Sequence, residues 1–157
     1  MVLYADKKEL ERFIAYYGRF LKKVPGIKTQ ALYAAAKSFQ GEVRKQIQEQ
    51  GVRDSFGRVR RWQQVYLGSK GGYAAVRPMS EHTQKTWKGK EVYSSQITGW
   101  LERGHGARKS RGGYYRSGVT YVKGHLFYSW AKSKGVRAAM DAFERELDRI
   151  TDEWEWE

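Results

Sequence analysis

The sequence of 157 residues contains no cysteine and only three histidines, and these scarcities exclude several classes of protein. Without cysteine there is no disulfide framework, no thiolate nucleophile and no thiolate ligand for a metal. The histidines, His82, His105 and His125, are far apart and match no metal-ligand spacing, so we expect no metal site. No apolar run approaches the roughly 18 residues that span a bilayer, and residues 1–10 lack the apolar core of a signal peptide. We therefore expect a soluble, cytosolic product that binds no membrane.

Acidic residues are also few, and only four lie within residues 51–125. These are Asp54, Glu81, Glu91 and Glu102. Such sparse carboxylates do not suit a hydrolase or nuclease. Glu102 and His105 are close enough to suggest an acid–base pair, but we expect Glu102 instead to bind a backbone or arginine group near the turn at Gly104. No phosphate-binding loop, dinucleotide fingerprint or nucleophile elbow occurs. The sequence therefore predicts a protein that is not an enzyme and uses no cofactor.

Positive charge is abundant, with a formal net charge of +13, and it is unevenly spread. Residues 51–125 carry 15 lysines and arginines against 4 acids, whereas residues 126–157 carry 5 against 8. A basic field of this kind attracts nucleic acid or acidic protein surfaces, and a generally solvated basic surface is the simpler interpretation. The contrast also allows self-assembly, in which the acidic end of one copy meets the basic middle of another.

Hydrophobic periodicity predicts two N-terminal helices. The first is expected over residues 6–23, with Asp6 as its cap and with Pro25-Gly26 ending it. Its apolar positions are Leu10, Phe13, Ile14, Tyr17 and Leu21. The second is expected over residues 29–50, with Thr29 as its cap and Gly51 as its stop. Its apolar positions are Leu32, Ala35, Ala36, Phe39, Val43 and Ile47.

The pattern then changes from helical spacing to short strands. Residues 52–60 are turn-like and basic, and residues 62–67 and 73–77 are predicted to form a hairpin joined by the loop 68–72. Residues 78–91 are predicted to be a loop. Residues 91–96 fit either a strand or the start of a helix.

Further along the chain, one or two helical turns over residues 97–103 are expected to stop at Gly104. A strand is expected over residues 119–122, and a final helix over residues 125–154, bent or split at Gly135. The fold class is therefore α+β: two N-terminal helices, a small and mainly antiparallel β-sheet, and a long C-terminal helix packed on the sheet. We expect residues 1–157 to form a single domain.

A basic, glycine-rich loop is expected over residues 104–118, between ordered elements. Loops of this length in a small domain are usually functional or disordered. Its candidate contact residues are Arg108, Lys109, Arg111, Tyr114, Tyr115 and Arg116, and Arg58, Arg60 and Arg61 form a second basic cluster. Arginine with tyrosine suits phosphate contact and base stacking, and the same pair is favoured at protein–protein contacts. A flexible, solvated loop is the alternative, and the sequence does not separate these interpretations.

Three short motifs resemble those of the head–tail joining proteins of long-tailed bacteriophages and prophages, also called minor tail, neck or tail-completion proteins. They are DSFGRVRRW at residues 54–62, ITGWLERGHG at residues 97–106 and VKGHLF at residues 122–127. The first is similar to that family's turn into a basic, apolar segment, and the second to its aromatic-apolar-Glu-aromatic-Gly element. The third is similar to its short glycine-containing step into the last helix. The chain departs from the family at Ser55, at the inserted Phe56 and at Arg103.

This resemblance implies a structural virion protein without an active site, located at the neck or at the head-proximal end of the tail. It implies copies arranged in a ring against tail-tube, tail-terminator or connector proteins, with DNA passing through the channel. The protein is then expected in the host cytoplasm during assembly and in the virion afterwards. The alternative function is a nucleic-acid-binding protein that uses the arginine- and tyrosine-rich loop.

Overall fold

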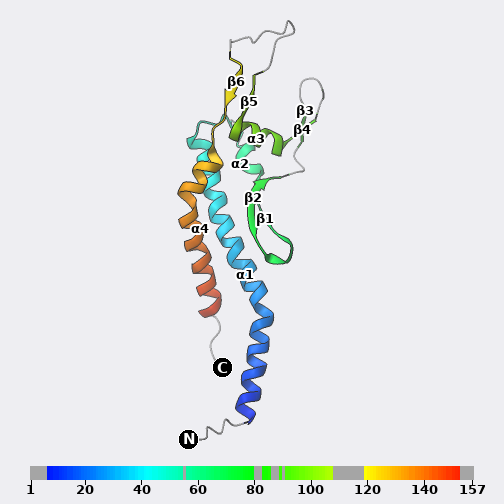
Figure 1. Cartoon of the computed structure of the whole chain (residues 1–157), viewed down its shortest axis with the longest axis vertical. Coiled ribbons are helices and arrows are strands. Elements are labelled where there is room, and N and C mark those ends of the chain that lie inside the picture. The colour runs from blue at the N-terminus through cyan, green and yellow to red at the C-terminus, as the bar shows by residue number, and fades with distance from the viewer. Residues whose placement is uncertain are drawn as a thin grey trace.

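The computed structural model describes residues 7–54, 56–79, 83–85, 89, 91–107 and 119–152. It contains helices α1 (Lys7–Glu49), α2 (Arg58–Trp62), α3 (Ser94–Arg103) and α4 (Phe127–Asp152), and the short 3-10 turn η1 (Ser69–Gly71). Its strands are β1 (Gln63–Leu67), β2 (Ala74–Pro78), β3 (Thr83–Lys85), β4 (Glu91–Tyr93), β5 (Gly104–Gly106) and β6 (Tyr121–Lys123). The molecule is elongated, with α1 and α4 side by side (Figure 1). The hairpin β1–β2 lies along α1, and the other two pairs of strands lie at one end of the helix pair. The α+β class is confirmed.

The N-terminal part of the chain is one helix of 43 residues, so the prediction of two helices separated at Pro25 is wrong. Pro25 lies inside α1, where it lacks the N–H of one helical hydrogen bond. The Thr29 hydroxyl, expected as a cap, donates to the Pro25 carbonyl at 2.7 Å. The apolar positions stay in phase across the proline, and Ile27 and Ala31 are buried. Burial of Ile27 and Ala31 sustains the helix through a residue that favours its end.

Two other expectations for this segment differ in their outcome. The stop near Gly51 is confirmed, because the helix ends at Glu49 and Gly51 has a φ of 71° that favours glycine. Asp6, the expected cap, lies outside the described residues, and so do the side chains of the apolar positions predicted between residues 10 and 21.

Helix α4 packs against α1 along most of its length. The Ser38 hydroxyl donates to the Ala138 carbonyl at 3.2 Å, and the Lys134 ammonium lies 3.3 Å from the Glu49 carboxylate. Gly135 is buried in this contact, and a Cβ there would lie 2.9 Å from Glu42. The expected split at Gly135 is wrong, because α4 is continuous, and the glycine permits close approach of the two helices. The long C-terminal helix is confirmed, and it ends at Asp152 among the described residues.

The hydrophobic core lies where the helix pair meets α2 and β1. Its buried members are Val43, Ile47, Val52, Val59, Trp62, Phe127 and Ala131. Trp62 had been expected in a strand but closes α2, and its indole N–H donates to the Thr98 hydroxyl at 3.1 Å. The expectation of turn structure over residues 52–60 is therefore wrong for its last part, because α2 begins at Arg58 and buries Val59.

Buried polar groups in this junction are all hydrogen-bonded, and Gln63 is their centre. The Gln63 carbonyl accepts from Gln40 at 2.6 Å and from Arg44 at 3.1 Å, while its side-chain amide donates to Thr98 at 3.3 Å. The Tyr128 hydroxyl donates to the Gln63 side-chain oxygen, so α4 reaches the first strand here. Burial, with a smaller contribution from Glu102, raises the pKa of Tyr128 well above its ordinary value. One glutamine thus joins α1, β1, α3 and α4.

The strands form three separate two-stranded antiparallel ribbons in the described part of the chain, not one sheet. The first, β1–β2, pairs Val65 with Val76 and confirms the predicted hairpin. The second, β3–β4, pairs Gln84 with Val92 and corrects the loop expected over residues 78–91. Residues 91–96, which fitted a strand or a helix, contain both, because β4 ends at Tyr93 and α3 begins at the next residue. The third ribbon, β5–β6, belongs to the candidate site.

Candidate assembly and nucleic-acid interface

The ribbon β5–β6 brings the second and third sequence motifs together. Helix α3 stops at Gly104, as expected, and this residue has a φ of 87°, which strongly favours glycine. Strand β5 then pairs with β6, with His105 opposite Val122 and Gly106 opposite Tyr121. The Ala107 N–H donates to the Thr120 carbonyl at 2.9 Å and extends the pairing beyond the strands. The two ends of the predicted basic loop are therefore held side by side by backbone hydrogen bonds.

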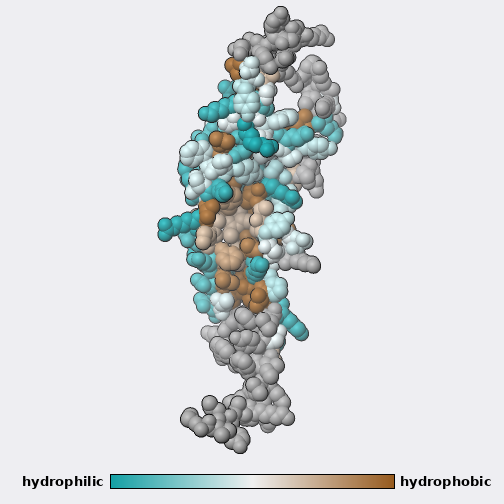
Figure 2. Space-filling view, in the orientation of Figure 1, coloured by the Kyte–Doolittle hydropathy of each residue, from teal (hydrophilic) through white to brown (hydrophobic). Residues whose placement is uncertain are grey.

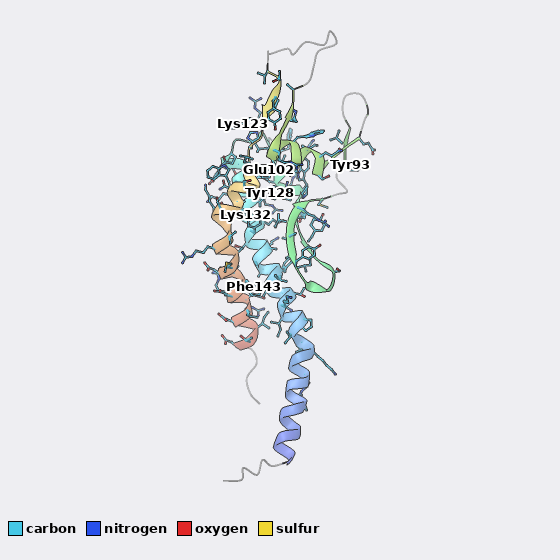
Figure 3. The ribbon with its side chains drawn as sticks, in the orientation of Figure 1. Tyr93, Glu102, Lys123, Tyr128, Lys132 and Phe143 are labelled. Atoms are coloured by element: carbon cyan, nitrogen blue, oxygen red, sulfur yellow. The ribbon has the colours of Figure 1, made fainter. Side chains whose placement is uncertain are left out.

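Glu102 anchors the base of this ribbon to the first turn of α4 (Figure 3). Its carboxylate accepts from the Tyr128 N–H at 2.8 Å and from the Ser129 N–H at 3.2 Å. A carboxylate at a helix N-terminus satisfies otherwise unpaired donors and complements the helix dipole. The expectation that Glu102 binds backbone groups is confirmed, but these groups belong to the start of α4 and not to the turn at Gly104. No local sequence pattern identifies α4 as the partner of Glu102, because the two N–H groups that it binds are 26 and 27 residues further along the chain.

Gly124 completes the anchor by close backbone approach. A Cβ at this position would collide with the Glu102 carbonyl oxygen and the Gly104 nitrogen. The adjoining His125 N–H donates to the Leu101 carbonyl at 2.7 Å, and the Leu126 N–H to the Glu102 carbonyl at 3.0 Å. Only glycine lets the two backbones lie this close, so the glycine in the third motif has a structural reason.

Beyond this base the ribbon projects from the body (Figure 1), and all three residues of β6 are exposed. Tyr121 is 53% exposed and Val122 44% exposed. The Trp100 and His105 rings lie 6.1 Å apart between centroids at the ribbon base, and Trp100 is 45% exposed. The ribbon therefore offers aromatic and apolar groups to solvent, which is unusual for a two-stranded hairpin without a partner.

The candidate contact residues of the loop itself lie outside the described residues. These are Arg108, Lys109, Arg111, Tyr114, Tyr115 and Arg116. Their role stays a prediction, and so does the flexibility expected for residues 108–118, whereas residues 104–106 form strand β5 and not a loop. The described residues fix only that the loop begins and ends at the two strands of one exposed ribbon.

Two residues of the second basic cluster, Arg60 and Arg61, line a shallow cleft of about 490 Å³ between α1 and α2. Its lining residues are Arg44, Lys45, Gln48, Phe56, Gly57, Arg60 and Arg61. The structure therefore brings two predicted residues, Arg60 and Arg61, to the same cleft as a basic patch of α1 that sequence reasoning missed. Arg44, Lys45 and Gln48 recur at helical spacing, and this spacing was the available signal.

Arg60 and Arg44 are largely committed to holding the fold. The Arg60 side chain lies 3.2 Å from the Asp54 carboxylate, whose side chain is only 6% exposed. Asp54 also accepts from the N–H groups of Val59 and Arg60, at 3.0 and 3.1 Å, and so caps α2. Arg44 donates to the carbonyls of Arg60 and Gln63 at 3.0 and 3.1 Å.

Arg58 and Arg61, in contrast, are exposed beside an exposed aromatic ring. The Arg58 guanidinium lies 5.4 Å from the centroid of the Phe56 ring, and Phe56 is 75% exposed. One Arg61 nitrogen donates to the Phe56 carbonyl at 2.9 Å, which leaves further N–H groups of the fork for a ligand. The cleft therefore presents cations next to a flat aromatic surface, a combination that binds phosphates and bases or an acidic protein segment.

Two further properties complete the description. Among residues 7–54 and the other described ranges, no cluster of three or more histidines and acids could hold a metal; His82 lies outside them. No helix in the described part of the chain is both long enough and apolar enough to cross a membrane. Comparisons with protein-family models, curated proteins and solved structures find no match for this chain.

Proposed function

We propose that the protein is a structural component of a phage or prophage virion that acts at the head–tail junction or at the head-proximal end of the tail. Copies assemble as a ring against tail-tube, tail-terminator or connector proteins, in the host cytoplasm first and then in the virion. The observation that carries this proposal is the ribbon β5–β6, which exposes Tyr121 and Val122 and is fixed to both α3 and α4 at its base.

The ribbon has the properties of an element that is completed by a neighbour. An isolated two-stranded hairpin is marginally stable in water, and apolar groups that are exposed on it gain most by contact with another protein. Tyrosine and tryptophan contribute strongly to such contacts. The rigid base restricts the direction of the ribbon, which reduces the entropy that association must overcome.

Electron microscopy of particles that lack the gene tests this proposal. We expect separate heads and tails, and we expect expression of the natural chain in trans to restore joined particles. The double variant Trp100→Ala/Tyr121→Ala should restore few joined particles, because both side chains lie on the exposed surface at the ribbon. Tyr73→Ala is the matched control, since Tyr73 is 59% exposed on a different hairpin. Fully joined particles in the absence of the gene would sink the proposal.

A second candidate function, nucleic-acid binding, is favoured by the cleft that Arg61 and Phe56 line and by Arg58, which lies over the Phe56 ring. Arginine side chains neutralise phosphates and release counterions, and an exposed phenyl ring stacks on bases. The two functions are compatible, because a ring around a DNA channel can hold cationic groups towards the DNA.

A salt-titrated DNA-binding assay separates the two. If the cleft binds nucleic acid, affinity falls steeply as salt rises, and Arg58→Glu/Arg61→Glu lowers the slope of log affinity against log salt by about 2. Lys132→Glu/Arg137→Glu on α4 is the charge-matched control and should change the slope less. Absence of binding near physiological salt would remove this candidate and leave the assembly role.

A further inference from the structure

One face of the α1–α4 pair is apolar and open to solvent. Figure 2 shows a hydrophobic surface over the two helices on the side towards the viewer. Helical spacing places on one side of each helix Leu32, Ala35 and Phe39 of α1 and Val136, Ala139, Met140, Phe143 and Leu147 of α4. Met140 is 58% exposed and Val136 is 44% exposed. Contiguous apolar surface of this kind usually marks an interaction site.

The two stripes meet along the helix contact, so they form one face. A Cβ on Gly135 of α4 would lie 3.3 Å from the Phe39 ring of α1. Gly135 directly precedes Val136, so Phe39 lies close to the start of the α4 stripe. Phe143 lies on the side of α4 that is turned towards α1 (Figure 3). Two helices with a shared apolar face are a common arrangement for receiving a third helix.

The N-terminal part of α1 extends beyond the α1–α4 pair. We define the arm as residues 7–26, because every described side chain within it is exposed and Ile27 is the first that is buried. The arm continues past the end of α4 with no other element beside it (Figure 1). Its sequence places Leu10, Phe13, Ile14, Tyr17 and Leu21 at helical spacing. A helix with an apolar stripe is stabilised mainly by packing, so this stripe suits a contact with an apolar surface.

We propose that the apolar face of α1–α4 binds the arm of a second copy of this chain. Lengths agree, because the stripe from Leu10 to Leu21 and the stripe from Val136 to Leu147 each extend about 16 Å at 1.5 Å per residue. The charges are opposite and therefore complementary. Residues 7–26 carry six lysines and arginines against two acids, and residues 141–152 carry five acids against two arginines. Each copy offers one arm and one face, which is the head-to-tail contact that closes into a ring.

Cysteine cross-linking tests this contact directly, because the chain has no cysteine of its own. Full-length Ile14→Cys, enlarged by an affinity tag, is mixed with full-length Met140→Cys and oxidised mildly. We expect a disulfide heterodimer as the main product, identified by its size. Ala15→Cys and Asp141→Cys are matched controls, since each neighbouring position is turned by about 100° around its helix. They should cross-link at least about tenfold less, as the disulfide reach of a few ångströms requires.

A double variant, Ile14→Cys/Met140→Cys in one chain, distinguishes a second copy from the same chain. Under the proposal it gives intermolecular disulfides and a ladder of oligomers. An arm that bends back at Pro25 would give an intramolecular disulfide and no ladder, and that result would overturn the proposal. Equal cross-linking of the probe and control positions would overturn it too.

Light scattering on full-length Met140→Glu gives an independent measurement. The charge lies on an exposed position, so circular dichroism should show an unchanged fold, while self-association weakens by about tenfold or more. Self-association equal to that of the natural chain would overturn the proposal. This inference rests on the ring of the proposed function, and the failures are distinguishable. Rings without the heterodisulfide reject the arm contact alone, whereas the heterodisulfide together with fully joined gene-deleted particles rejects the virion position alone.

Discussion

The centre of the molecule and its two projecting ends differ in how far their side chains are buried. In the junction around Gln63 and Trp62, buried polar groups are paired and the apolar side chains are enclosed. In the arm of α1 and the ribbon β5–β6, the described side chains are exposed, and several are apolar or aromatic. The comparison teaches that folding and association are assigned to different residues, so stability and assembly should be separable by substitution.

The largest expected effect is the loss of Phe127 from the core. Phe127→Ala should lower the free energy of unfolding by about 3–5 kcal/mol, because the side chain is fully buried among α1, α2 and α4. Val122→Ala on the ribbon should change it by no more than about 0.5 kcal/mol. Denaturant unfolding of the two variants measures the difference. Equal losses would show that the ribbon belongs to the folding core and would break the comparison.

Tyr128→Phe should destabilise the junction by about 1–3 kcal/mol, because it leaves the buried Gln63 side-chain oxygen without its donor. Tyr33→Phe is a matched control, since Tyr33 is 47% exposed on α1. Chemical denaturation at neutral pH measures both. A negligible effect at Tyr128 would mean that another group satisfies Gln63.

Alkaline pH should also act through Tyr128, whose pKa is raised by burial and, to a lesser extent, by Glu102. The unfolded chain loses the phenol proton near pH 10, before the folded chain does. The stabilising contribution is therefore complete below about pH 10 and falls as the pH rises above it, by up to about 1.4 kcal/mol per pH unit. Unfolding free energies measured at pH values from about 9 to 11 should fall less steeply in Tyr128→Phe than in the natural chain. Parallel slopes would contradict the assignment.

Glu102→Ala should cost about 1 kcal/mol, because it removes the acceptor for two N–H groups at the start of α4. Glu91→Ala, an exposed carboxylate on β4, is the control and should be nearly neutral. Thermal unfolding followed by circular dichroism compares the two. The result sharpens the comparison, because Glu102 is the residue at which the stable centre and the exposed ribbon join.

The smallest effect on stability is expected for Arg58→Glu/Arg61→Glu, within about 0.5 kcal/mol, since both side chains are exposed. Arg60→Ala should cost more, because it leaves the nearly buried Asp54 carboxylate without its ion pair. Unfolding by denaturant separates these arginines. If all three behave alike, the division between structural and available cations in the cleft is wrong.

Local sequence patterns predicted the secondary structure correctly where local interactions determine it. The β1–β2 hairpin, the stop at Gly104 and the helix from Phe127 all follow from periodicity and glycine. Pro25 was misjudged, because the local preference of proline is opposed by burial of Ile27 and Ala31 in contacts that only the folded chain provides.

The remaining differences arise from contacts between distant residues. Helix α2 and strand β4 are short, and each is held by burial, of Val59 in one and Val92 in the other. In the cleft, Arg44 donates to carbonyl groups 16 and 19 residues away, so no local pattern indicates these two hydrogen bonds. Sequence alone identified Arg58, Arg60 and Arg61 as one cluster and could not tell that Arg60 is occupied by Asp54.

The anchoring of the ribbon at two helices has a mechanical consequence. Strand β5 continues directly from α3, while the Glu102 carboxylate and carbonyl hold the start of α4. The ribbon is thus a lever whose fulcrum lies at Glu102 and Gly124, and a load on its tip is divided between two helices. A neighbour that pulls on the ribbon therefore pulls on the first turn of α4, and strain at one end of the molecule is carried into the helix pair at its centre.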